Sequence, residues 1–212
     1  MPCPDKLIAM NIYVETNFVL ELALVQEQHP SCEGILALCQ AGSARLALPA
    51  FCIAEAYETV IRRANKRTQI ANELAVELRQ LGRSRPYQHE IDAFQNMTAL
   101  LVRSLQDEDR RLVDALTQIL AVAEVIALEA SVALDATRYR ERYKLQPQDA
   151  IVYSSVISHL SRTSEADNCF INRNSRDFDD PDIVESLESS NCRMLFSFED
   201  GYNYIRHRLS AS

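Results

Sequence analysis

The stretch NIYVETNFVLELAL, from Asn11 to Leu24, decides the fold. Its first half is a strand-favouring apolar run that ends at Glu15. Its second half, continued by one residue, places Phe18, Leu22 and Val25 at i, i+4 and i+7, which is the spacing of a helix with one buried face. The stretch therefore predicts a buried strand that carries a carboxylate at its own C-terminal end, directly before a helix.

Five short β-like runs of this kind are separated by helical segments. They cover Leu7 to Val14, Arg45 to Leu48, Glu124 to Leu128, Cys169 to Asn172, and Arg193 to Phe196. Because a crossover between parallel strands needs a long connection, usually a helix, this alternation predicts a mainly parallel sheet with helices on both faces. The expected fold class is α/β.

The interval between the second and third strands departs from this alternation. It is roughly 75 residues long and contains three helical patterns, over residues 50–67, 87–105 and 109–123. Pro49 suits the first turn of the first helix, and Pro86 marks a break before the second. We expect a single domain over residues 1–212 that carries a helical insertion at about 68–122. Further helices are expected over residues 129–143, 147–160 and 198–209.

The composition indicates a globular protein without a membrane or secretory address. With 212 residues, 47% of them hydrophobic, the chain can bury a sizeable core. The apolar run KLIAMNIYV is too short to cross a bilayer and no small-residue cleavage site follows it, so we expect no membrane contact and a cytoplasmic location. The six cysteines lack zinc-ligand spacing and are expected to be reduced, mostly buried thiols.

Several common α/β chemistries are absent from the sequence. None of the four glycines stands in a G-x-G-x-x-G or G-x-x-x-x-G-K context, so the usual phosphate-binding loops are missing. There is no G-x-S-x-G motif for a serine hydrolase, and the four histidines show no H-E-x-x-H spacing. These absences direct attention to the acidic residues.

Acidic and amide side chains recur at the ends of strands and the starts of helices. They are Glu15, Glu55, Asp149, Asn174 and Asp177. Because ligands bind at the carboxyl ends of the strands in an open parallel sheet, we expect these side chains to meet in one crevice. Clustered carboxylates repel one another unless a cation joins them, and oxygen ligands suit Mg²⁺ or Mn²⁺. Such an ion can activate water for attack on a phosphodiester.

Four short motifs in this order resemble those of the PIN-domain nucleases. They are YVETNFVLEL, LPAFCIAEAYETV, PQDAIVYSSV and INRNSRDF, and the resemblance spans residues 7–196. It implies a three-layer α/β/α sandwich around a five-stranded parallel sheet. It also implies a Mg²⁺- or Mn²⁺-dependent nuclease, most often an endoribonuclease and frequently the toxin of a toxin–antitoxin pair.

The resemblance assigns roles to individual residues. The catalytic and metal-binding acids would be Glu15, Glu55, Asp149 and Asp177, with Asn174 as a further metal ligand and Thr16 and Asn17 in support. The sequence departs from the family pattern in two places. Glu15 stands where Asp is usual, and Asn172 stands where Thr is usual.

Each of these residues also has a simpler structural interpretation. Asp149 could only complement a helix dipole, which contributes roughly 0.3 to 1 kcal/mol, and Glu55 could be a solvated surface acid. Asp177 could cap a turn, and Asn174 could occupy a left-handed loop position.

Basic residues near these motifs could contact the phosphates of an RNA substrate. Arg62, Arg63 and Lys66 belong to a cluster on the helix over residues 50–67, while Arg173 and Arg176 alternate with the acids of the fourth motif. The net charge of −8 argues against non-specific coating of nucleic acid, and solvated helix or loop surfaces are the simpler interpretation of these cations.

Two other functions are compatible with the sequence. The site could be catalytically degenerate in a protein that binds a partner through its helical insertion, or the enzyme could hydrolyse a small phosphate ester. The expected partners are RNA, an antitoxin or another protein, and a second copy of the chain.

Overall fold

The computed structural model describes residues 10–87, 91–163 and 167–211. Its centre is a five-stranded sheet in the order β3-β2-β1-β4-β5, in which every neighbouring pair is parallel. The strands are β1 (Met10–Val14), β2 (Arg45–Pro49), β3 (Glu124–Ile126), β4 (Asp167–Ile171) and β5 (Cys192–Leu195). The five predicted strands are confirmed to within about two residues at each end, as expected for strand boundaries. Residues 7–9 of the first predicted strand lie outside the described residues.

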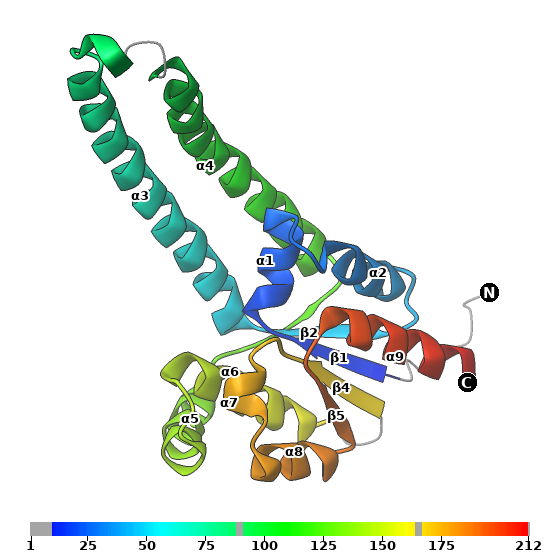
Figure 1. Cartoon of the computed structure of the whole chain (residues 1–212). Coiled ribbons are helices and arrows are strands. Elements are labelled where there is room, and N and C mark those ends of the chain that lie inside the picture. Colours follow the sequence, from blue (N-terminus) through cyan, green and yellow to red (C-terminus); the bar gives the residue numbers. More distant parts are fainter. Residues whose placement is uncertain (1–9, 88–90, 164–166, 212) are drawn as a thin grey trace.

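Helices cover both faces of this sheet and form the outer two layers (Figure 1). One face carries α1 (Thr16–Leu24), α2 (His29–Gln40) and α9 (Phe198–Ala211). The other face carries α5 (Ala130–Tyr143), α6 (Pro147–Leu160), α7 (Ser175–Phe178) and α8 (Pro181–Glu188). The predicted three-layer α/β/α class is therefore confirmed.

The strand order creates a switch point beside the central strand. From β1 the chain builds β2 and β3 on one side of the sheet, and later β4 and β5 on the other. The connections that leave β1 and β4 therefore diverge, and a crevice opens between their carboxyl ends.

The core holds these layers together and fixes the helices that start at that edge. All five residues of β1 are buried. The ring of Phe18 on α1 packs edge-on against that of Phe198 on α9, with the ring centroids 5.5 Å apart. The rings of Phe170 on β4 and Phe178 on α7 pack with their centroids 5.8 Å apart. Aromatic pairs of this kind contribute roughly 0.5–1.5 kcal/mol beyond the area that they bury. The elements around the crevice are thus anchored in the interior.

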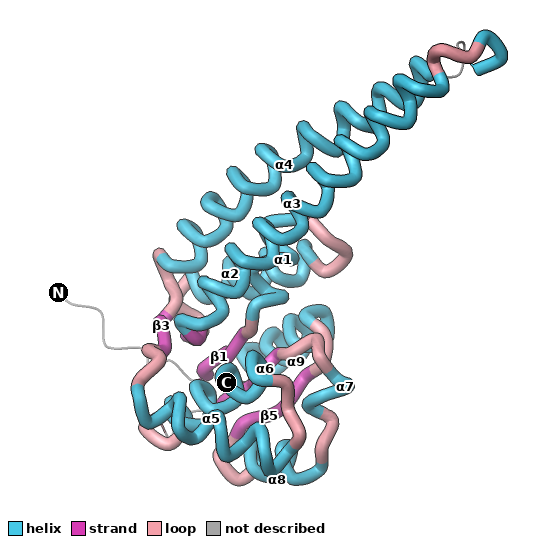
Figure 2. Tube along the Cα trace, turned by 90° about the vertical axis from the view of Figure 1, so that its left-hand side faces the viewer, coloured by secondary structure: helices cyan, strands magenta, loops and turns pink. Residues whose placement is uncertain are grey.

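Between β2 and β3 the chain forms a long helical hairpin that projects from the sheet (Figures 1 and 2). It consists of α3 (Ala50–Leu81, 32 residues), a short 3₁₀ turn over Arg85–Tyr87, and α4 (Ile91–Leu120, 30 residues). Pro49 ends β2 and caps α3, so its expected place inside the first turn is wrong by one residue.

The prediction of three helices in this interval is wrong. The first helix continues past residue 67 to Leu81 because no glycine or proline occurs before Gly82. The second and third predicted helices are one, because the polar residues between them, QDE at 106–108, include strong helix formers. No helix among the described residues is long and apolar enough to cross a membrane. The five cysteines within them are free and buried.

Candidate active site

Glu15 lies directly beyond β1 and caps α1. One carboxylate oxygen, Oε2, accepts a hydrogen bond from the backbone N–H of Asn17 at 2.7 Å. The other, Oε1, accepts from the backbone N–H of Arg173 at 3.4 Å, across the switch point from β4. The side chain is buried, so one acid ends the strand, starts the helix and joins the two connections that diverge at the crevice.

Burial raises the pKa of the Glu15 carboxyl to about 7. The hydrogen bonds from Asn17 and Arg173 lower this pKa, and the negative charge of Glu55 raises it. Desolvation therefore outweighs the two backbone donors, and the charged form of the carboxyl is less favourable here than in water.

Thr16 connects Glu15 to the second motif. Its hydroxyl donates a hydrogen bond to Oε2 of Glu55, which lies in the second turn of α3. Glu55 is partly buried, so the interpretation as a fully solvated surface acid is wrong. The contact fixes the N-terminal ends of α1 and α3 to each other.

Asn174 connects the third and fourth motifs. Its amide nitrogen Nδ2 donates to Oδ2 of Asp149 at 3.0 Å and to Oδ2 of Asp177 at 2.7 Å. Its backbone N–H donates to Oδ1 of Asn172 at 2.7 Å, which fixes the turn after β4. Asn174 has a φ of −86°, so the alternative interpretation, a left-handed loop position, does not apply. The amide dipole thus neutralises part of the repulsion between two carboxylates.

Burial also raises the pKa of the Asp149 carboxyl to about 6. The hydrogen bond from Asn174 lowers this pKa, while the charges of Asp177 and Glu55 raise it. The acids of different motifs are therefore close enough to influence one another's ionisation.

Most of the predicted site residues line one depression of about 410 Å³ at this edge of the sheet. They are Glu15, Thr16, Asn17, Glu55, Arg62, Arg63, Asp149, Arg173 and Asn174. Asp177 does not line the depression, but it accepts a hydrogen bond from Asn174, which does. Lys66 is exposed one turn beyond Arg62 on α3, and Arg176 is exposed on α7 without lining the depression.

The donor set is chemically suited to a hard divalent cation. Its carboxylate and amide oxygens are the ligands that Mg²⁺ and Mn²⁺ prefer. In the part of the chain that the structure describes, no group of three or more His, Cys, Asp or Glu side chains is spaced to hold a metal ion. Thr16 instead donates a hydrogen bond to Glu55, and Asn174 donates to Asp149 and Asp177. A rotation of the Asn174 amide would present its oxygen instead of its nitrogen.

Glu21 is a residue of the site that the sequence did not reveal. It is fully buried on α1, forms an ion pair with Nη1 of Arg173, and accepts the backbone N–H of Gln28 at 2.9 Å through Oε2. Arg173 is therefore not a freely solvated loop cation. The signal in the sequence was a single acid inside the apolar run NFVLELAL.

The remaining cations near the depression differ in whether they are paired. Arg67 forms an ion pair with Glu108 of α4 at 2.7 Å. Within residues 10–87, 91–163 and 167–211, Arg62, Arg63 and Lys66 take part in no ion pair. These three side chains are available to an anionic ligand.

Comparisons with known proteins place this geometry in context. A family model described as PIN domain matches residues 12–178. A crystal structure of VapBC2 from Rickettsia felis, bound to a DNA fragment from their promoter, is similar over 87% of this chain and 97% of that chain, with 11% sequence identity and a TM-score of 0.42. No curated protein matches the chain.

Proposed function

Because the chain belongs to the PIN-domain family, we propose that it is a nuclease that hydrolyses phosphodiester bonds of RNA with Mg²⁺ or Mn²⁺. The observation that carries the proposal is the gathering of Glu15, Glu55, Asp149 and Asn174 in one depression at the switch point of the sheet. These residues come from four separate segments of the chain, and packing alone gives no reason for their meeting.

The proposed metal ligands are Glu15, Glu55 and Asp149, with Asn174 and Asp177 completing the site directly or through water. When bound, the cation supplies an activated water and neutralises charge on the phosphodiester. The chain's own residues prepare the site. Two backbone N–H groups hold Glu15, Thr16 holds Glu55, and Asn174 keeps Asp149 and Asp177 together.

The free cations on α3 supply the proposed contacts to RNA phosphates. Arg62 and Arg63 line the depression and Lys66 lies one turn further out. Three such contacts to a single strand correspond to a slope of about −2 in log K against log salt. We assign Arg173 mainly to holding the turn after β4, because its guanidinium pairs with Glu21.

The wider biological context belongs to the same proposal. We infer a protein partner such as an antitoxin, a cytoplasmic location, and one domain over residues 1–212 in which the helical insertion begins on α3. Leu112, Leu116 and Ile119 of α4 belong to the same hydrophobic core as β1, which supports a single domain.

The test is cleavage of RNA by the purified protein with Mg²⁺ or Mn²⁺, compared with Asp149→Asn. Because the amide cannot supply a charged ligand, we expect this variant to lose at least a hundredfold in rate at unchanged fold. Asp135→Asn on α5 is the matched control, since Asp135 is a partly exposed acid whose ion pair in the described structure is with Arg138, and it should cleave like the wild type. Equal cleavage by Asp149→Asn and the wild type would contradict the proposal.

A second candidate function is a binding module with a degenerate site. The observation that favours it is the Asn174 amide nitrogen, which faces two carboxylates where a cation would otherwise lie. The binding module predicts that Mn²⁺ at millimolar concentration does not bind and that RNA stays intact. A small-ester phosphohydrolase would instead cleave a chromogenic phosphodiester and leave long RNA untouched.

A further inference from the structure

Glu21 is a buried acid that the proposed metal site does not use. It lies on α1, is fully buried, and is not among the residues that line the depression. Its Oε1 forms an ion pair with Nη1 of Arg173, in the turn after β4. A charge in the interior is costly unless it is paired and hydrogen-bonded, so the pair with Arg173 has to be accounted for.

The second oxygen of Glu21 fixes the carboxylate in one orientation. Oε2 accepts the backbone N–H of Gln28 at 2.9 Å, directly before α2. The side chain of Gln28 in turn accepts the backbone N–H of Phe198 through its Oε1 at 2.6 Å, at the start of α9. Glu21 is thus attached to the turn between α1 and α2 and, through that turn, to α9.

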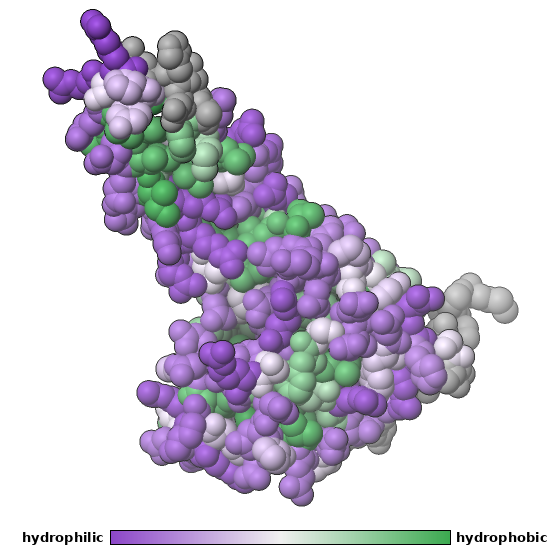
Figure 3. All heavy atoms as spheres, in the orientation of Figure 1, coloured by the Kyte–Doolittle hydropathy of each residue, from purple (hydrophilic) through white to green (hydrophobic). Residues whose placement is uncertain are grey.

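Arg173 is held both by its backbone and by its side chain. Its backbone N–H donates to Oε1 of Glu15 at 3.4 Å, while its guanidinium pairs with Glu21. The residue lines the depression at the base of the hairpin, where the surface of the molecule is hollowed (Figure 3). Because the backbone of Arg173 already contacts Glu15, a guanidinium released from Glu21 has the acids of the depression within reach.

The acids of the depression would attract a released guanidinium. Within the described residues, Glu15, Glu55 and Asp149 form no ion pair. The planar fork of an arginine matches two carboxylate oxygens, so it would occupy the ligands proposed for Mg²⁺ or Mn²⁺. The ion pair with Glu21 instead holds this cation on a residue outside the depression.

We propose that Glu21 is a positioning residue for the metal site, which keeps the guanidinium of Arg173 off the carboxylates and leaves the backbone N–H for Glu15. The inference rests on the proposed function, because it requires a divalent cation at those carboxylates. The pair of Glu21 and Arg173 has no net charge, so the depression keeps its negative charge for the cation. Partners that act through a metal ligand commonly change metal affinity by about 10- to 100-fold when they are mutated.

The test measures the affinity of the full chain for Mn²⁺ by electron paramagnetic resonance, which needs no substrate. Glu21→Gln keeps the size of the side chain and an acceptor for Gln28, and it removes the charge that holds Arg173. We expect this variant to bind Mn²⁺ about tenfold more weakly than the wild type. Glu33→Gln is the matched control, because it removes the same charge from a side chain that is 62% exposed on α2. It should bind Mn²⁺ like the wild type.

A double variant separates competition by Arg173 from a general loss of structure. In Glu21→Gln with Arg173→Gln both charges are removed, so neither a buried unpaired acid nor a released cation remains. We expect its affinity for Mn²⁺ to return to within about threefold of the wild type. Urea denaturation measures the free energy of unfolding of each variant separately. A Glu21→Gln variant that is less stable but binds Mn²⁺ as tightly as the wild type would show that Glu21 only stabilises the fold.

Cleavage of RNA at increasing Mn²⁺ concentration gives a second readout. Competition for the cation raises the Mn²⁺ concentration at half-maximal rate and leaves the rate at saturating Mn²⁺ unchanged. We therefore expect Glu21→Gln to raise this midpoint about tenfold and to keep the saturating rate within about twofold. A lower saturating rate at an unchanged midpoint would contradict the proposal.

The outcomes distinguish this proposal from the function on which it rests. A wild type that binds no Mn²⁺ at millimolar concentration refutes the metal site itself. A wild type that binds Mn²⁺ no better than Glu21→Gln, or a double variant as weak as the single one, refutes only the role of Glu21. If Glu21→Gln fails to fold by circular dichroism, Glu21→Asp takes its place. Its shorter side chain loosens the contact with Arg173 and should weaken Mn²⁺ binding about threefold, and wild-type affinity would overturn the proposal.

Discussion

At the scale of the residue, Glu15 is held by backbone donors on both sides of the switch point. Asn17 and Arg173 each give it an N–H, yet burial still raises its pKa to about 7. Burial therefore costs the charged form more than the two donors return, and an added countercharge would stabilise that form. The proposed cation would supply it.

This raised pKa predicts that the metal-free protein loses stability as the pH rises. The Glu15 carboxyl has a pKa of about 7 when folded against a model value of 4.5, so the unfolded chain releases its proton first. The contribution of Glu15 to the free energy of unfolding is fully present below about pH 4.5. It falls between about pH 4.5 and 7 and then levels off, with a total loss on the order of 3 kcal/mol. Asp149, with a pKa of about 6, shifts in the same direction.

The measurement is urea denaturation at pH 5 to 8 with a chelator present. Glu15→Gln should flatten the dependence, because the glutamine cannot ionise. Millimolar Mg²⁺ should restore stability at pH 8 and have little effect at pH 5. Stability that rises with pH in the chelated wild type would show that the carboxyl is not destabilised by burial.

At the scale of the element, the strands and most helices could be predicted from the apolar pattern of the sequence, whereas the two helices of the hairpin could not. The five strands are apolar runs between turns, and parallel pairing buries them on both faces, so pattern and structure agree. In the hairpin the polar run at 106–111 looks like a break, although its Gln, Glu and Arg residues favour a helix. Propensity decides there because the outer face of α4 is exposed.

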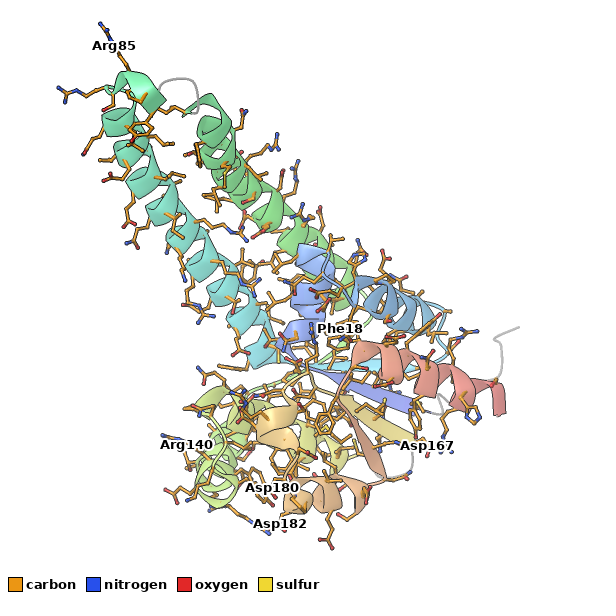
Figure 4. The ribbon with its side chains drawn as sticks, in the orientation of Figure 1. Phe18, Arg85, Arg140, Asp167, Asp180 and Asp182 are labelled. Carbon is orange, nitrogen blue, oxygen red and sulfur yellow. The ribbon has the colours of Figure 1, made fainter. Side chains whose placement is uncertain are left out.

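The basic residues of α3 lead to a prediction about RNA binding. Lys66→Ala should weaken binding of single-stranded RNA about uniformly across sequences and make the slope of log K against log salt less steep by about 0.7. Arg140→Ala is the control, since Arg140 is exposed on α5, away from the depression (Figure 4). Titrations at several salt concentrations give both slopes. Equal slopes for Lys66→Ala and the wild type would place the RNA elsewhere.

At the scale of the whole molecule, the sheet edge collects acids that lie up to 162 residues apart in sequence, from Glu15 to Asp177. Their meeting could be predicted because parallel strands place their carboxyl ends together. The pair of Glu21 and Arg173 could not, since a local pattern does not show which distant cation faces a buried acid. The same limit applied to Asn174, whose neutral amide bridges Asp149 and Asp177.

The central claim is that these acids hold a divalent cation, and a crystal soaked with Mn²⁺ tests it most directly. We predict an anomalous-scattering peak between Glu15 and Asp149, with the Asn174 amide turned so that its oxygen faces the ion. Crystals of Asp149→Asn should lack the peak under the same soak. A wild-type depression without any peak at millimolar Mn²⁺, with Asn174 still donating to both aspartates, would contradict the account.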